Sequence, residues 1–230
     1  MTLTRAGSYR QLPGLMTLMT GDEKHGPSAT STLDAIWVLY DQVLRVDPRR
    51  PEDPDRDRFL LSKGHGPMAY YAVLAAKGFL TRDQLSNFCN LSSGLGYHPD
   101  RTLIPGVEIS SGSLGHGLGL AVGTAIGLRL TGHPDSRVVV LTGDAELDEG
   151  SNFEAIQYAG RARLDRLMAV VIDNKSASLG WPGGIAERFT REGWTGSEVD
   201  GRDHSALAEA YAAGVPGQPH VVVAQVEARS

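Results

Sequence analysis

Residues 137–174 read RVVVLTGDAELDEGSNFEAIQYAGRARLDRLMAVVIDN, and this stretch decides the fold class. It begins with a β-branched run, Arg137–Thr142, and ends with a second apolar run, Leu167–Ile172. Short continuous runs of this kind are typical of strands buried on both faces of a parallel sheet. Between them, Ser151 and Glu154 match a capping box, which predicts a helix that reaches about Arg161. The pattern is strand, helix, strand.

The same alternation continues on both sides of this stretch. Residues 205–213 are predicted as a helix and residues 220–226 as a last strand. Apolar spacing predicts three earlier helices, over residues 31–44, 67–77 and 118–130. The proline- and charge-rich residues 47–58 exclude regular structure. Together these elements predict an α/β fold, a parallel sheet with helices on both faces, in a single domain over residues 1–230.

Composition excludes several classes of function. The 230 residues carry a formal net charge of −5, with 41% hydrophobic and 21% charged residues. This is the composition of a folded chain, and its acidic balance argues against a nucleic-acid or anionic-membrane surface. The single cysteine, Cys89, excludes an internal disulfide framework and a zinc ribbon. Since no apolar run approaches the ~20 residues of a membrane span, we expect a cytoplasmic protein.

Polar residues follow the two central strands where each strand ends. Asp144 comes directly after the first, and Asn174 follows the second, 30 positions later. Neighbouring parallel strands present their carboxyl ends at one edge, where ligands gather. A carboxylate, an amide oxygen and a main-chain carbonyl near Ser176 are hard ligands that suit Mg²⁺ or Ca²⁺. The alternative is that Asp144 caps a turn and Asn174 satisfies a loop.

A glycine-rich turn, residues 112–117 (GSLGHG), leads into the predicted helix over residues 118–130. Such a turn leaves backbone N–H groups free to hold an anion such as phosphate. Glycine then recurs every four residues and lines one helix face, at Gly115, Gly119, Gly123 and Gly127. We expect that face to pack closely against another helix or another subunit. The alternative to anion binding is that the glycines of this segment serve packing only.

Four of the seven histidines lie in loops rich in glycine or proline, where binding groups concentrate: His25, His65, His98 and His116. Loop histidines could donate to phosphate or carbonyl oxygens, or move protons near neutral pH. The other three are expected to be structural.

These motifs together resemble those of the transketolase family. Residues 56–65 (RDRFLLSKGH) and 103–117 (LIPGVEISSGSLGHG) are similar to two signatures of that family. Gly143 and Asp144, followed by Asn174, are similar to the thiamine-diphosphate motif of the superfamily. The resemblance runs from about His25 to Val226 and is closest to the N-terminal, diphosphate-binding half of a split transketolase. It implies the thiamine-diphosphate-binding fold.

The resemblance also implies a role for each matching position. Asp144, Asn174 and the main-chain oxygen of Ser176 would hold Mg²⁺ (or Ca²⁺) on the diphosphate. Thiamine diphosphate would also be contacted by His65, Gly112, Ser113, Leu114, Gly143 and Ala145. The catalytic residues His25 and His98 would line the substrate channel, with His25 a candidate for proton transfer, and Glu149 would face a subunit interface.

The sequence departs from the family pattern in three places. Ala145 stands where the family has a glycine, and its methyl group would crowd the diphosphate. The family's Gly-His-Pro-Gly loop is replaced by Lys24–Pro27. The sequence ends at Ser230, ahead of a family loop with another active-site histidine. The family's pyrimidine-binding domain, which carries the activating glutamate, is also outside these residues, so the resemblance implies a partner subunit that supplies it in an α₂β₂ assembly.

The expected activity is transfer of a two-carbon ketol unit from a ketose-type donor to an aldehyde acceptor. Two alternatives stay open. One is a component of a thiamine-diphosphate-dependent 2-oxoacid decarboxylase or dehydrogenase. The histidines of the KHGP, KGHG and YHPD loops favour the sugar-handling branch over this alternative. The other is a non-catalytic scaffold, which Ala145 favours and the presence of Asp144, Asn174 and His65 disfavours.

Overall fold

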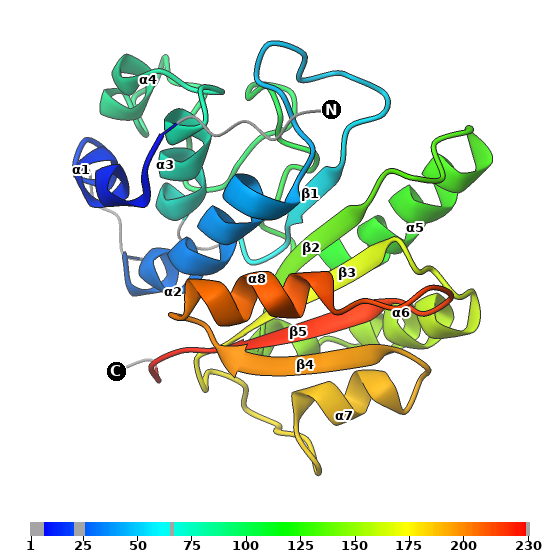
Figure 1. The fold of residues 1–230 in the computed structure, drawn as a ribbon. Coiled ribbons are helices and arrows are strands. Elements are labelled where there is room, and N and C mark those ends of the chain that lie inside the picture. The colour runs from blue at the N-terminus through cyan, green and yellow to red at the C-terminus, as the bar shows by residue number, and fades with distance from the viewer. Residues whose placement is uncertain (1–6, 21–25, 65–66, 229–230) are drawn as a thin grey trace.

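A five-stranded parallel sheet runs through the computed structural model (Figure 1), which describes residues 7–20, 26–64 and 67–228. Its spatial order is β1-β2-β3-β5-β4, and every neighbouring pair is parallel. The strands are β1 (Arg58–Leu61), β2 (Val138–Gly143), β3 (Leu167–Asp173), β4 (Thr195–Asp200) and β5 (His220–Gln225). The predicted α/β architecture with a parallel sheet is confirmed.

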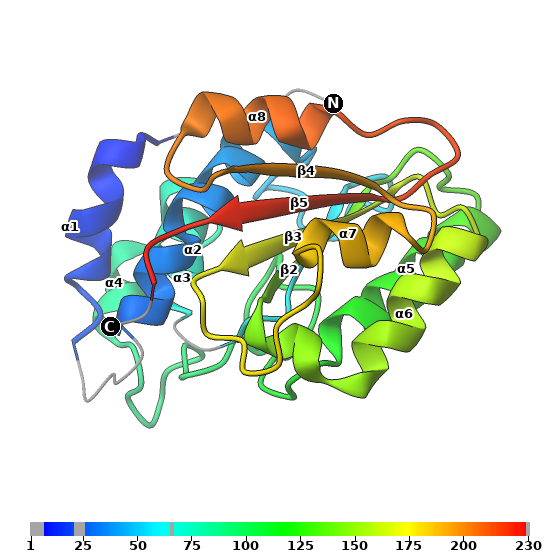
Figure 2. The same cartoon turned by 90° about the horizontal axis from the view of Figure 1, so that it is seen from below.

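Helices cover both faces of the sheet, so the molecule has three layers (Figures 1 and 2). One face carries α1 (Leu12–Met16), α2 (Gly26–Val38), α3 (Met68–Ala76) and α8 (His204–Ala212). The other face carries α5 (Gly117–Leu130), α6 (Gly150–Arg161) and α7 (Ile185–Thr190). A short helix, α4 (Arg82–Ser86), packs against α3, and a π-helical turn, Leu39–Val43, continues α2.

The central strands explain why two cores form. Along β2, Val139 and Leu141 enter the core under α2 and α3, whereas Val138 and Val140 enter the core under α5 and α6. Strand side chains alternate between faces, so a strand covered on both sides must be apolar throughout. No helix among the described residues is long and apolar enough to cross a membrane.

The two edge strands escape prediction from the sequence. β1 has only four residues and begins at Arg58, the last residue of the segment from which regular structure was excluded, so that exclusion is wrong at this residue. β4 alternates half-buried and exposed residues and is polar over most of its length, TGSEVD. β4 leaves every second residue exposed, so it needs no continuous apolar run. β1 is buried throughout, but its three apolar residues, 59–61, form a run too short to be recognised as a strand.

The predicted capping box at Ser151 is wrong. α6 begins at Gly150 with Glu149 as its N-cap residue, and no side chain caps it. The Ser151 hydroxyl donates instead to the Gly115 carbonyl at 2.8 Å. The glycine-rich turn therefore lies against the beginning of α6.

Candidate functional site

The carboxyl ends of β2 and β3 bring Asp144 and Asn174 to the same edge of the sheet. Gly143 pairs with Ile172 in the parallel register, so the two polar residues follow on neighbouring strands. Both are buried, with 2% and 4% of their surface exposed. The Asp144 carboxylate accepts hydrogen bonds from the Ser176 N–H and hydroxyl, both at 2.6 Å, and from the Ala177 N–H at 3.0 Å. The segment after β3 is thus folded onto Asp144.

The amide oxygen of Asn174 lacks a partner. Its Oδ1 atom is buried and accepts no hydrogen bond from the described part of the chain. A buried acceptor left unpaired costs about 1–3 kcal/mol, and a hard cation is a suitable partner for an amide oxygen beside a carboxylate. Residues 7–20, 26–64 and 67–228 hold no cluster of three or more His, Cys, Asp or Glu residues suited to a metal. A metal ion at this edge would therefore depend on amide and main-chain oxygens.

The glycine-rich turn meets His98. Gly112 has a φ of +126°, and a Cβ atom there would lie 3.2 Å from Cδ2 of the His98 ring. His98 is half-buried, and its Nδ1 atom lies 3.0 Å from the Gly64 carbonyl oxygen. The structure therefore brings His98, the turn and the residue just before His65 together. His65 and His25 themselves lie outside the described residues.

The other residues predicted to contact the cofactor differ in their exposure to solvent. Ser113 and Leu114 are exposed at the tip of the turn, with Leu114 48% exposed. Gly143 is buried at the end of β2, and Ala145 begins a 3-10 helix, η3 (Ala145–Asp148), directly after Asp144. All of these segments lie beyond the carboxyl ends of the first three strands.

Two N–H groups at the start of α5, those of Gly115 and Gly117, are not free, contrary to the expectation from the sequence. Gly115 donates to Oε1 of Glu146 at 3.0 Å, and Gly117 donates to the Ser62 hydroxyl at 3.1 Å. Only glycine fits at 117, because a Cβ atom would lie 2.1 Å from Oγ of Ser62. The anion at this helix end is the chain's own carboxylate. Sequence reasoning missed both Glu146 and Ser62.

The glycine face of α5 is open over most of its length. A Cβ atom at Gly119, Gly123 or Gly127 would meet no atom of the described residues within 4 Å. The expected packing against another helix of this chain is therefore wrong for these three, and packing against another subunit stays a prediction. Gly115 differs, because its Cβ atom would lie 2.5 Å from that of the exposed Glu149. A subunit interface at Glu149 also stays a prediction.

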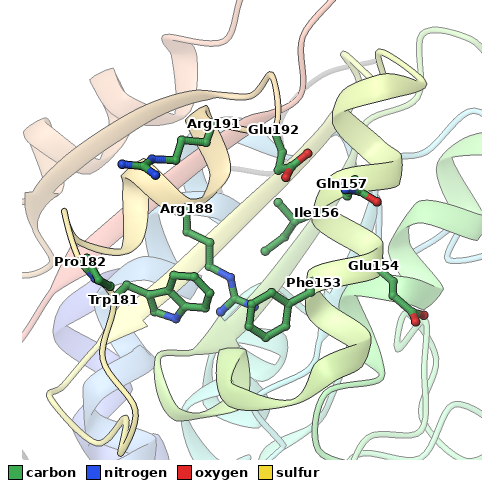
Figure 3. Close-up of a pocket in the computed structure, with 9 residues that line it drawn as sticks. All are labelled: Phe153, Glu154, Ile156, Gln157, Trp181, Pro182, Arg188, Arg191 and Glu192. Carbon is green, nitrogen blue, oxygen red and sulfur yellow. The ribbon is translucent and has the colours of Figure 1, made fainter.

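A buried arginine fixes the segment after β3 against α6 and α7 (Figure 3). The Arg188 guanidinium carbon lies 3.7 Å from the ring centre of Phe153 and 4.0 Å from that of Trp181. Nη1 donates to the Leu147 carbonyl at 2.6 Å. Burial lowers the pKa of Arg188 to about 10, and the Asp148 carboxylate opposes that shift.

A cavity of about 380 Å³ adjoins this stack, lined by Phe153, Glu154, Ile156, Gln157, Trp181, Pro182, Arg188, Arg191 and Glu192 (Figure 3). No residue predicted to contact the cofactor lines it. The cavity is therefore separate from the edge that carries Asp144 and Asn174.

The fold is that of the α/β thiamine-diphosphate-binding class. The structure superposes on transketolase from Leishmania mexicana with a TM-score of 0.79 at 28% identity, covering 96% of this chain and 37% of that chain. Residues 17–225 match the family described as transketolase, thiamine diphosphate binding domain. The chain belongs to the transketolase family and corresponds to its N-terminal, thiamine-diphosphate-binding part.

Two relatives show how far the similarity extends. One subunit of the apulose-4-phosphate transketolase from Actinobacillus succinogenes is 36% identical over 207 residues, which are 87% of this chain and 75% of that protein. A protein named Ferredoxin fas2 from Rhodococcoides fascians is 56% identical over 223 residues, 97% of this chain and 73% of that protein. The chain thus spans about three quarters of these relatives and under two fifths of the solved transketolase chain.

Proposed function

We propose that this chain is the diphosphate-binding subunit of a split transketolase-like enzyme, which transfers a two-carbon ketol unit from a ketose-type donor to an aldehyde acceptor. The observation that carries the proposal is the unpaired, buried Oδ1 atom of Asn174, next to Asp144 at the carboxyl edge of the sheet. In a chain of this family, a metal-bound diphosphate is the ligand whose chemistry suits that edge.

In this proposal Asp144, Asn174 and the main-chain oxygen of Ser176 hold Mg²⁺, or Ca²⁺, on the diphosphate. The Asp144 carboxylate offers about four lone-pair positions and accepts three hydrogen bonds from residues 176 and 177, which leaves room for a cation. The remaining contacts to thiamine diphosphate come from His65, Gly112, Ser113, Leu114, Gly143 and Ala145.

When bound, thiamine diphosphate supplies a carbanion at its thiazolium ring. The chain's own residues bind and orient the diphosphate and manage protons around the substrate. His98 lies beside Gly112 and Gly64, which supports the proposal that its ring contacts a substrate oxygen near the turn. His25 is proposed as the second histidine of the substrate channel and as the group that transfers a proton.

A separate pyrimidine-binding subunit is proposed to complete the enzyme, as an α₂β₂ assembly. Two relatives are named as transketolase subunits, one of an apulose-4-phosphate transketolase and the other of a 6-deoxy-6-sulfo-D-fructose transketolase. These 230 residues lack the ligands for a ferredoxin-type iron–sulfur cluster, because such clusters are held by several cysteines and Cys89 is the only cysteine here.

The test is co-expression with a candidate pyrimidine-domain subunit, followed by assay of ketol transfer in the presence of thiamine diphosphate and Mg²⁺. We expect turnover by the complex and none by the isolated chain. Clear turnover by the pure, isolated chain would refute the partner requirement. Carbon dioxide release from a 2-oxoacid without ketol transfer would favour the decarboxylase alternative. An assembled complex with neither activity nor bound cofactor would favour the scaffold.

A further inference from the structure

The carboxylate of Glu146 lies at the centre of a buried hydrogen-bond network at the carboxyl edge. The residue is 2% exposed. Its Oε1 atom accepts from the Ser62 hydroxyl and from the Gly115 N–H at 3.0 Å. Its Oε2 atom accepts from the Thr142 hydroxyl at 2.7 Å and from the Gly143 N–H at 3.4 Å. Four donors therefore occupy the roughly four acceptor positions that a carboxylate offers.

These donors come from three segments that are far apart in the sequence. Ser62 directly follows β1 and stands three residues before His65. Gly115 follows the turn of residues 112–114, and Thr142 and Gly143 end β2 just before Asp144. Each segment carries or adjoins at least one residue assigned to the cofactor in the proposed function. One carboxylate thus joins the three segments that would surround the diphosphate.

The network also occupies the N-terminus of α5. Gly115 donates to Glu146 directly, and Gly117 donates to the Ser62 hydroxyl, which itself donates to Glu146. A negative charge is favoured at this end of a helix by the orientation of the peptide dipoles. Because Glu146 supplies that charge, the diphosphate is left to the turn of residues 112–114 rather than to the first turn of α5.

From the opposite side, the amide of Asn152 on α6 donates to the main-chain oxygen of Glu146 at 2.6 Å. The side chain and the main chain of Glu146 are thus both held. A buried network in which every member is satisfied defines a single arrangement of its segments.

We infer that Glu146 is the positioning residue of the cofactor site: it sets the end of β1, the glycine-rich turn and the end of β2 in the arrangement that presents Gly112–Leu114 and Asp144 to the diphosphate. This inference rests on the proposed function for the identity of the ligand, whereas the joining of the three segments does not depend on any ligand.

The test compares Glu146→Gln with a matched control, Asp57→Asn, in the full 230-residue chain assembled with a pyrimidine-domain subunit. Gln keeps the size of Glu, but its NH₂ group cannot accept, so donors on one side of the network lose their acceptor. Asp57 is also a buried carboxylate with several donors, but it precedes β1 at the other end of the strand. Both variants remove one buried charge, and only Glu146→Gln alters the carboxyl edge.

Two measurements are made on each variant: amide hydrogen exchange at Gly115, Gly117 and Gly143 without ligand, and the dissociation constant of thiamine diphosphate with Mg²⁺. For Glu146→Gln we expect faster exchange at these amides and at least about tenfold weaker binding, the effect of losing one hydrogen bond to a charged acceptor. For Asp57→Asn we expect lower thermal stability, but unchanged exchange at these glycines and binding within about twofold of the parent. If Glu146→Gln does not fold, Ser62→Ala serves as the second variant, with faster exchange at Gly117 as the expected result.

Each outcome is decisive. Unaltered exchange at all three amides, Gly115, Gly117 and Gly143, in the Glu146 variant would overturn the joining of the segments, whether or not the chain binds a cofactor. Altered exchange with unchanged affinity would make Glu146 purely structural and overturn its positioning role. If the parent chain, assembled with a pyrimidine-domain subunit, binds no thiamine diphosphate, the proposed function fails, and with it the cofactor part of this inference. The exchange pattern still decides whether Glu146 joins the three segments.

Discussion

The two ends of the parallel strands are built differently: the amino edge, where the strands begin, and the carboxyl edge, where they end. At the amino edge, the Asp57 carboxylate is completely buried and accepts from the backbone N–H and guanidinium groups of both Arg45 and Arg137, at 2.8–2.9 Å for the closest pairs. His220, at the start of β5, is held through Nδ1 by the Thr195 hydroxyl at 2.7 Å and through Nε2 by the Ala210 carbonyl at 3.0 Å. Every polar group named here has a partner within the chain.

The carboxyl side leaves polar groups unpaired. Within the described ranges, buried side-chain atoms that lack a hydrogen-bond partner occur only in Ser111, Asp148, Asn174, Trp181 and Arg188. Asp148 lies in the segment after β2, and Asn174 and Trp181 lie in the segment after β3. Ser111 precedes α5 and lies beside Gly64, and Arg188 donates to the Leu147 carbonyl. Unpaired buried groups are rare and costly, so the unpaired oxygen of Asn174 supports the proposal that the carboxyl edge binds a ligand, whereas the amino edge serves stability. The predictions below test that contrast.

The largest effect is expected at the amino edge. Asp57→Asn removes the carboxylate that two arginines share, and breaking a buried ion pair of this kind costs about 3 kcal/mol. For a chain of this size that corresponds to a fall in melting temperature of roughly 6–12 °C, with cofactor affinity unchanged. Thermal unfolding and a binding titration check both parts. A parallel loss of affinity would show that the two edges are not independent.

The same carboxylate gives a pH dependence. Burial by itself raises the pKa of Asp57, but the Arg45 hydrogen bonds and the Arg137 charge outweigh it and hold the pKa below its ordinary value. A depressed pKa adds stability above the unfolded value of about 3.9, and that contribution disappears as the pH falls through the folded pKa. The stability gap between the parent and Asp57→Asn should therefore narrow below about pH 4. Unfolding curves from near-neutral pH down through this range measure it, and a constant gap would contradict the account.

At the carboxyl edge, Asp144→Ala should abolish Mg²⁺-dependent cofactor binding. The variant loses a proposed charged ligand to the cation, and we expect affinity to fall at least about a hundredfold, or ~2.7 kcal/mol. Equilibrium dialysis with thiamine diphosphate measures the affinity, and circular dichroism shows whether the fold is intact. A folded variant that binds the cofactor as the parent does would remove Asp144 from the site.

For Asn174→Ala we expect a smaller effect, which differs between the melting temperature without ligand and the melting temperature with ligand. Without ligand, this change removes an unpaired buried acceptor, so the melting temperature should stay within about 3 °C of the parent. With saturating cofactor and Mg²⁺, the stabilisation seen for the parent should shrink, because binding weakens by roughly tenfold. The Asp57→Asn variant should keep its full ligand-induced shift. A parent-like shift in Asn174→Ala would show that its oxygen binds no cation.

The central strands and the helices between them follow from the sequence, because burial on both faces demands continuous apolar runs. β2 and β3 were predictable for that reason, whereas the four-residue β1 and the polar β4 carry no such run. The pairing of Asp144 with Asn174 at one edge was predictable from strand spacing alone.

The role of Glu146 was not predictable in the same way. One signal was present: an acidic run, DAELDE, follows the buried strand directly. Its partners Ser62 and Gly115 come from segments 84 and 31 positions away in the sequence, and only the tertiary fold brings them to one carboxylate. For the same reason, two N–H groups expected to be free at the start of α5, those of Gly115 and Gly117, are occupied.

The most direct test of the central claim is a calorimetric titration with thiamine diphosphate, first with Mg²⁺ and then with EDTA, on the chain co-expressed with a pyrimidine-domain partner. The account predicts binding near one cofactor per copy of this chain in Mg²⁺ and its loss in EDTA. If a demonstrably assembled complex bound no cofactor in Mg²⁺, the carboxyl edge would not be a cofactor site, and the chain would be better described as a scaffold that keeps the family fold.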